Sequence, residues 1–192
     1  MDCFALLDEP RRPWLDTAAL KEKYLSLAAA THPDQMADAA EKEAAQKRFA
    51  EFNNAHDTLR DTRRRLAHLL TLERGEKPPE VHDIPPETAE LFLEVGALLK
   101  PVGEFIQKQE AQTSPIVKAR ALPRALELLD QVTALQQSIT TKLTALDTQL
   151  QSLNDRWGTA ESLNEAEQLW HQASYLNRWR EQLQDHAFRL TP

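Results

Sequence analysis

Three adjacent residues, His32, Pro33 and Asp34, carry the side chains best suited to act on another molecule. Proline fixes its own backbone angle and disfavours the helical conformation at the residue before it, so the tripeptide predicts a sharp stop in a helix. The imidazole can donate or accept a hydrogen bond, and the carboxylate matches the fork of an arginine guanidinium. As a bare tripeptide this sequence indicates a helix stop at Pro33 with Asp34 capping the turn, and a role toward a partner protein depends on the residues around it.

Residues that would indicate catalysis or metal binding do not form a pattern. The five other histidines lack a metal-binding spacing such as His-Glu-x-x-His, and the one cysteine cannot form a multi-cysteine zinc site. The sequence contains no glycine-rich phosphate loop, nucleophile elbow or paired-carboxylate signature. We therefore expect a protein that is not an enzyme and that has no cofactor and no metal ion.

The elements that must position the tripeptide are helices. A short apolar turn at residues 3–7 is followed by helices from Asp16 to about residue 31 and over residues 38–59. Asp16 is a good N-cap, and Pro33 ends the first of these helices. The short link between the two helices predicts an antiparallel hairpin with the tripeptide at its tip, and a further helix at 62–72 covers it.

Four prolines and one glycine within residues 73–86 predict a linker. We therefore expect an N-terminal domain at 1–72 and a second domain at 87–192. The second domain reads as helices at about 86–112, at 117–153 and from a capping box of Ser162 with Glu165. Intervals of three and four predict the seam of the middle helix, and we place in it Leu122, Ala125, Leu129, Val132, Gln136, Ile139, Leu143, Leu146, Leu150 and Leu153. The fold class is thus all-α, with a helical hairpin followed by a three-helix bundle.

Charge excludes some partners. The formal net charge is -7, which argues against a protein that binds the phosphate backbone of nucleic acids, despite the run Arg63-Arg64-Arg65. No apolar run approaches the length of a membrane span, and Met1-Asp2 does not begin a signal peptide. We expect no nucleic acid, no membrane and a cytoplasmic location.

The residues around the tripeptide resemble the J-domain of DnaJ-type co-chaperones, namely Tyr24 and Leu27 before it and Phe49, Phe52, Asn53, Ala55 and Leu59 after it. The resemblance implies that the loop docks on a DnaK/HscA-type ATPase chaperone and promotes ATP hydrolysis. It implies a chaperone-binding set of His32, Pro33, Asp34, Lys21, Lys23, Lys47 and Arg48. One departure is that Ala28–Thr31 and Gln35 stand where J-domains usually carry basic residues.

Further residues are similar to the HscB-like iron–sulfur cluster branch of this family, namely Leu15-Asp16-Thr17, Leu59-Arg60, Arg65, Leu69-Leu70 and Gly75. The resemblance implies that the second domain binds an iron–sulfur scaffold protein through its first helix, at Leu91, Phe92, Glu94, Val95 and Leu99. Helical periodicity alone places Leu91 and Val95 in a bundle core. Two alternatives stay open: a J-protein whose client lies outside iron–sulfur assembly, and a structural coiled-coil adaptor with a weakened J-domain.

Overall fold

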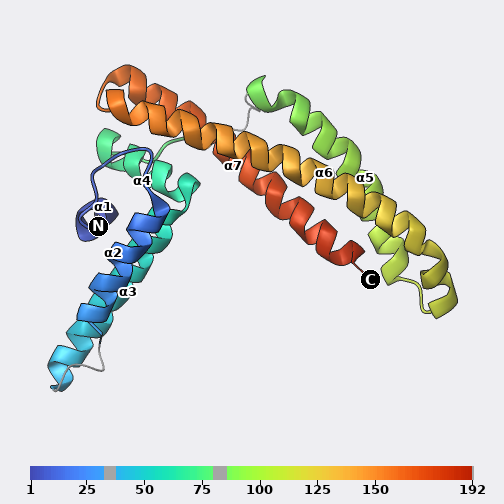
Figure 1. Cartoon of the computed structure of the whole chain (residues 1–192), viewed down its shortest axis with the longest axis horizontal. Coiled ribbons are helices and arrows are strands. Elements are labelled where there is room, and N and C mark those ends of the chain that lie inside the picture. The colour runs from blue at the N-terminus through green and yellow to red at the C-terminus, as the bar shows by residue number, and fades with distance from the viewer. Residues whose placement is uncertain (33–37, 80–85, 192) are drawn as a thin grey trace. The chain divides into compact units, whose positions relative to one another are not determined.

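The computed structural model describes residues 1–32, 38–79 and 86–191, and every regular element in these ranges is a helix (Figure 1). The predicted all-α class is confirmed. The first helices are α1 (Cys3–Leu6), α2 (Thr17–Ala30), α3 (Ala39–Arg60) and α4 (Thr62–Arg74). After the short turn η2 (Pro86–Thr88) come α5 (Ala89–Glu110), α6 (Pro115–Leu153), the turn η3 (Asn154–Arg156) and α7 (Ala160–Leu190).

The chain divides into two compact units. Unit 1 comprises Met1–Glu80 with Asp147–Trp170, and unit 2 comprises Val81–Leu146 with His171–Pro192. Helices α6 and α7 therefore contribute to both units. The domain limits of 1–72 and 87–192 stay a prediction.

The helices of unit 1 begin and end where local side-chain chemistry dictates. The Asp16 carboxylate accepts hydrogen bonds from the amides of Ala18 and Ala19 at 2.9 and 3.2 Å, as expected of an N-cap. Helix α4 ends at Gly75, which adopts a left-handed φ of 79° and donates its amide to the Thr71 carbonyl at 3.0 Å.

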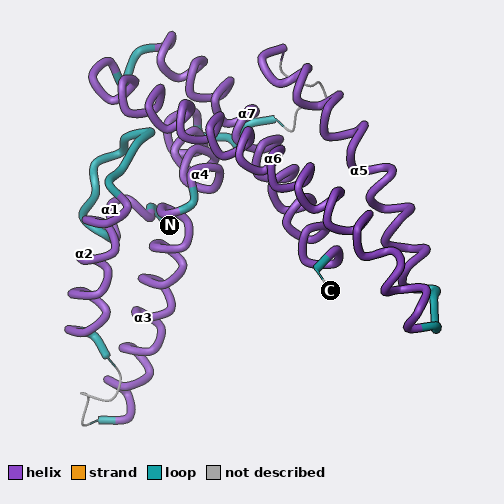
Figure 2. Tube along the Cα trace, turned by 45° about the vertical axis from the view of Figure 1, so that its right-hand side comes forward, coloured by secondary structure: helices purple, strands orange, loops and turns teal. Residues whose placement is uncertain are grey.

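Helices α2 and α3 lie side by side and antiparallel, and both views show this hairpin (Figures 1 and 2). Its apolar faces meet α1 and α4 in one core, so the tip of the hairpin projects from a packed base. The buried members of this core are Cys3, Phe4, Leu7, Leu15, Leu20, Phe52, Ala55, Leu59 and Leu69.

The core of unit 2 forms along three long helices. The buried positions of α6 within unit 2 are Ala125, Leu128, Val132, Leu135, Ile139 and Leu146, and the first five recur at intervals of three and four. The predicted seam was wrong at three places: Leu128 and Leu135 occupy the core in place of the neighbouring Leu129 and Gln136, and Leu122 is exposed. Adjacent residues lie about 100° apart around a helix, so a pair of neighbouring leucines does not reveal which one faces inward.

The predicted capping box of Ser162 with Glu165 was also wrong. Helix α7 begins at Ala160, and the reciprocal bonds run between Thr159 and Ser162: each backbone amide donates to the other side-chain hydroxyl at 3.1 Å. Ser162 is thus the third helical residue of a capping box that starts three residues earlier.

Candidate functional site

His32 lies directly beyond the end of α2. The Thr31 hydroxyl donates to the Leu27 carbonyl at 2.8 Å, which closes the last turn of the helix. The half-buried His32 ring meets the Phe49 ring of α3 edge-on, with ring centroids 5.7 Å apart. Contact with α3 therefore positions the imidazole at the end of the hairpin. Pro33 and Asp34, the other two residues of the predicted tripeptide site, lie outside the described residues.

Polar contacts set the register of α2 on α3. The Tyr24 hydroxyl donates to Asn53 Oδ1 at 2.6 Å, and the Tyr24 ring stacks on His56 with centroids 4.3 Å apart. Burial lowers the pKa of His56, and the charge of Arg60 adds to this effect. The lowered pKa favours the neutral form of His56 in this stack.

The four predicted cations of the hairpin differ in availability. Lys21 on α2 and Lys47 and Arg48 on α3 are exposed. Lys23 instead donates its ammonium to the Asp8 carbonyl at 2.7 Å and pairs with Glu9 at 2.8 Å. Lys23 therefore links α2 to the segment after α1. Its ammonium group is paired within the domain and is less available to a partner protein.

A histidine that sequence reasoning left without a role holds the N-terminus. His68 Nε2 on α4 accepts a hydrogen bond from the Cys3 amide at 3.0 Å, and its ring stacks on Phe4. The imidazole must be unprotonated at Nε2 to accept this bond. Burial lowers the pKa of His68 and favours that form.

Arg65 is buried, with 1% of its surface exposed. Its Nε donates to the Pro13 carbonyl at 2.9 Å, and a second nitrogen donates to the Leu59 carbonyl at 2.8 Å. Arg65 thus connects the segment before α2 to the end of α3. The sequence did not reveal this role, because Arg65 follows Arg63 and Arg64, which are both exposed.

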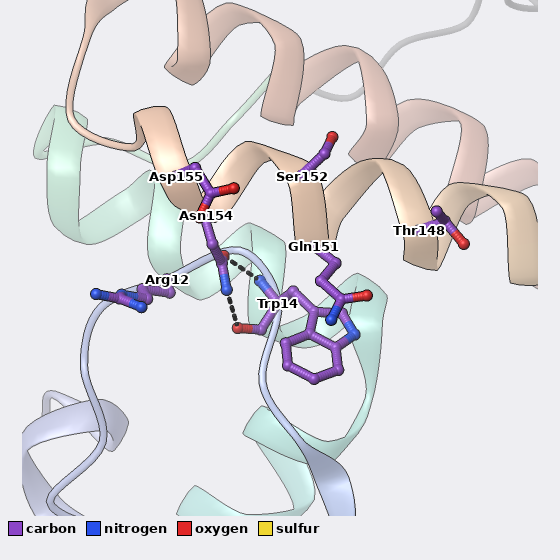
Figure 3. Close-up of a pocket in the computed structure, with 7 residues that line it drawn as sticks. All are labelled: Arg12, Trp14, Thr148, Gln151, Ser152, Asn154 and Asp155. Carbon is purple, nitrogen blue, oxygen red and sulfur yellow. Dashed lines mark hydrogen bonds between the residues drawn. The ribbon is translucent and has the colours of Figure 1, made fainter.

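The loop before α2 also contacts the end of α6 within unit 1. The Asn154 side chain accepts from the Trp14 amide at 3.1 Å and donates to the Trp14 carbonyl at 3.0 Å (Figure 3). The Trp14 indole nitrogen donates to Asp147 Oδ2 at 2.9 Å. An open, polar hollow of about 460 Å³ lies beside these contacts, with Arg12 and Gln151 among its lining residues. No sequence pattern joined these residues, because they lie more than 130 positions apart.

The predicted client-binding residues separate into two groups on α5. Leu91 and Val95 are each 2% exposed and pack in the core of unit 2, so they are unavailable to a partner while α5 stays packed. Phe92 is 42% exposed, with its ring 6.2 Å from that of Trp179, and Glu94 is exposed. Leu99 is half-buried.

Leu93 was missed, although it is 69% exposed beside Phe92. The available signal was an apolar residue that lies off the core periodicity of its helix. Phe92, Leu93 and Glu94 are three consecutive exposed residues of α5, and we call this exposed segment the α5 patch.

Two other features, a metal site and a membrane span, are absent from the residues that the structure describes. These residues contain no group of three or more histidine, cysteine or acidic side chains that could hold a metal ion. Among these residues, no helix has the length and apolar character needed to cross a membrane.

Comparisons with known proteins agree with this geometry. The DnaJ domain family model matches residues 3–68. The HscB co-chaperone homologue of Shewanella halifaxensis is 44% identical over 61 residues, which is 31% of this chain and 35% of the relative. The homologue of Shewanella woodyi is 39% identical over 74 residues, or 38% of this chain and 42% of the relative. The matched segment thus spans less than half the length of these curated relatives.

Two solved structures share the fold over nearly the whole chain. The human co-chaperone HscB superposes with a TM-score of 0.63 at 21% identity, covering 96% of this chain and 81% of that one. The chaperone HscB of Vibrio cholerae gives a TM-score of 0.55 at 23% identity, covering 96% of both chains. Residues 3–68 of the chain therefore match the DnaJ domain, and the chain is similar to HscB co-chaperones in this segment and in fold.

Proposed function

We propose that this chain is a co-chaperone that stimulates ATP hydrolysis by a DnaK/HscA-type chaperone through the loop His32-Pro33-Asp34. The observation that carries the proposal is the position of His32 at the end of an antiparallel α2–α3 hairpin within a matched DnaJ domain. The hairpin acts as a ligand of the chaperone, so its binding energy shifts the chaperone toward a state that hydrolyses ATP.

The exposed cations point to the side of the hairpin that docks. Lys47 and Arg48 flank Phe49, which contacts His32, so their charges lie near the loop. Lys21 is nearer the base, where its charge acts on His56. We therefore rank Lys47 and Arg48 above Lys21, and Lys21 above the internally paired Lys23, as chaperone contacts.

A single-turnover ATPase assay with purified DnaK-type chaperones tests this function. His32→Gln and Asp34→Asn should each abolish most of the stimulation while leaving the helical circular dichroism unchanged. Lys47→Ala should weaken stimulation, and Lys142→Ala, an exposed lysine of α6 outside the hairpin, serves as its control. Equal stimulation by wild type and by Asp34→Asn would remove the assignment.

We further propose that the client is an iron–sulfur cluster scaffold protein and that it binds the α5 patch. Support comes from the HscB names of the relatives and from exposed apolar side chains next to the carboxylate of Glu94. Large exposed apolar side chains that adjoin one another favour binding of a partner. The apolar seam of α6 is already buried within unit 2, which leaves less apolar surface for the alternative of a self-associating coiled-coil adaptor.

Co-purification with a cysteine-rich iron–sulfur scaffold tests the client assignment. Leu93→Ser should reduce retention of the scaffold by about tenfold or more, as expected where an interface anchor is lost. Ile116→Ser removes a similarly exposed apolar side chain at the start of α6 and should have no effect. Retention that is unchanged by Leu93→Ser would exclude this surface.

A further inference from the structure

Among the described residues, the buried guanidinium of Arg65 donates hydrogen bonds only to neutral acceptors. Two bonds run to the Pro13 and Leu59 carbonyls, and the third runs to the Thr62 hydroxyl at 3.3 Å. All three acceptors are neutral. A buried cation with neutral acceptors alone is costly, so a negative charge close to it contributes strongly to the stability of the fold.

Two carboxylates supply that charge. Burial lowers the pKa of Arg65 to about 10, and the charges of Asp147 and Asp61 oppose this shift. Asp61 already caps α4 by accepting from the Arg64 amide at 2.8 Å. Asp147 lies on α6, outside the segment that matches the DnaJ domain.

A continuous set of bonds links Arg65 to Asp147. Arg65 donates to the carbonyl of Pro13, the next residue is Trp14, and the Trp14 indole nitrogen donates to Asp147 at 2.9 Å. The same carboxylate therefore holds the indole ring, and its charge favours the protonated form of Arg65.

We propose that Asp147 is the charge partner that α6 provides to the DnaJ domain, stabilising buried Arg65 and orienting Trp14. The DnaJ domain and residues 147–170 then fold as one cooperative structure. This inference concerns stability, so it holds or fails independently of the proposed co-chaperone function.

Other contacts keep the two segments together when Asp147 is changed. Asn154 holds the Trp14 backbone (Figure 3), and Arg74 pairs with Glu167 at 2.7 Å. Trp157 packs against the core of the DnaJ domain. An Asp147 variant should therefore fold, with lower stability.

A double-mutant cycle in urea tests the proposal with the full chain. Trp14→Phe should raise the unfolding equilibrium constant about tenfold, as expected for loss of a charge-assisted bond. Asp147→Asn should raise it further, because this change also removes the negative charge that acts on Arg65. Adding Trp14→Phe to Asp147→Asn should cause little further change, because the bond is already weakened. Asp155→Asn makes the same charge change at an exposed position nearby and should have no effect. Additive effects, or equal effects of Asp147→Asn and Asp155→Asn, would overturn the proposal.

Hydrogen exchange provides a second measurement that does not require the Asp147 variant to fold. Trp14→Phe keeps an aromatic ring in place but removes the donor. Amides of α4 should then lose about tenfold in protection, whereas amides of α5 should keep wild-type protection. Unchanged protection in α4 would contradict the coupling.

Discussion

The two units of this chain use different interactions to hold helices together. In unit 1, α1, α2 and α4 have only 4, 14 and 13 residues, and side chains such as Asp2, Asp16 and Asp61 bond to their first amides. In unit 2, α5 has 22 residues, and the 39-residue α6 lies largely in the same unit. Their buried positions are almost entirely apolar.

Helix length contributes to this difference in α1, α2 and α4, whereas α3 of unit 1 is as long as α5, with 22 residues. Each helix end leaves up to four backbone groups without an intrahelical partner, so ends form a large share of a short helix. Long helices gain most of their stability from an apolar face that packs against its neighbours. Replacing polar side chains should therefore lower the free energy of unfolding most in unit 1. Removing apolar volume should lower it most in unit 2.

The largest expected effect is in unit 1. Arg65→Met should lower the free energy of unfolding by about 4 kcal/mol, because it leaves the buried Pro13 and Leu59 carbonyls without donors. Urea denaturation measures this change. Arg64→Met alters an exposed neighbour of the same type and should leave stability unchanged. A loss equal to that of the control would show that the buried cation is not structural.

A slightly smaller effect should follow from loss of volume in unit 2. Ile139→Ala removes a fully buried side chain from the α6 seam and should lower the free energy of unfolding by about 3 kcal/mol. The same denaturation experiment applies, with Gln137→Ala at an exposed position of the helix as control. If Ile139→Ala and Gln137→Ala had the same free energy of unfolding, the apolar seam would not be the main source of stability in unit 2.

Helix caps give an intermediate test within unit 1. Asp16→Ala should lower the free energy of unfolding by about 1 kcal/mol, because two amides of α2 lose their acceptor. Asp38 also precedes a helix, but its side chain makes no capping bond, so Asp38→Ala should change little. Thermal denaturation of the two variants measures the difference, and equal melting temperatures would refute the role of capping.

The smallest effect should be a pH dependence from His68. Its pKa is lowered in the folded chain by burial, so the unfolded chain binds more protons at mildly acidic pH. Stability should therefore fall as the pH drops through 6.5, and it should level off below the folded pKa. His68→Gln keeps a side-chain acceptor without titrating, so its stability should vary less with pH. The pH dependence of stability that remains in His68→Gln should include a contribution from His56, whose pKa is also lowered.

Local features of the fold could be predicted from the sequence. The Asp16 cap and the helix stop before Pro33 depend on neighbouring residues, and the hairpin follows from two apolar stripes with a short link. The register of α6 could not be predicted fully, because Leu128 and Leu129 are adjacent and equally apolar.

The polar contacts of unit 1 were beyond sequence reasoning for a different reason. The bond between Trp14 and Asp147 joins residues 133 positions apart, so it depends on tertiary packing that no local pattern specifies. In the sequence, Arg65 stands beside two arginines that are exposed. Only its burial in the structure distinguishes Arg65 from them. On α5, periodicity placed Leu91 and Val95 in the core, but it did not draw attention to Leu93.

The pairing of Lys23 with Glu9 has a consequence for the speed of complex formation. With that ammonium engaged at the base of α2 and no charge on Ala28–Thr31, few cations remain to attract an acidic surface over long distances. The overall charge of -7 opposes such attraction further. Raising the ionic strength should therefore slow association with an acidic partner only slightly, and short-range fit at the end of the hairpin should decide how long the complex lasts.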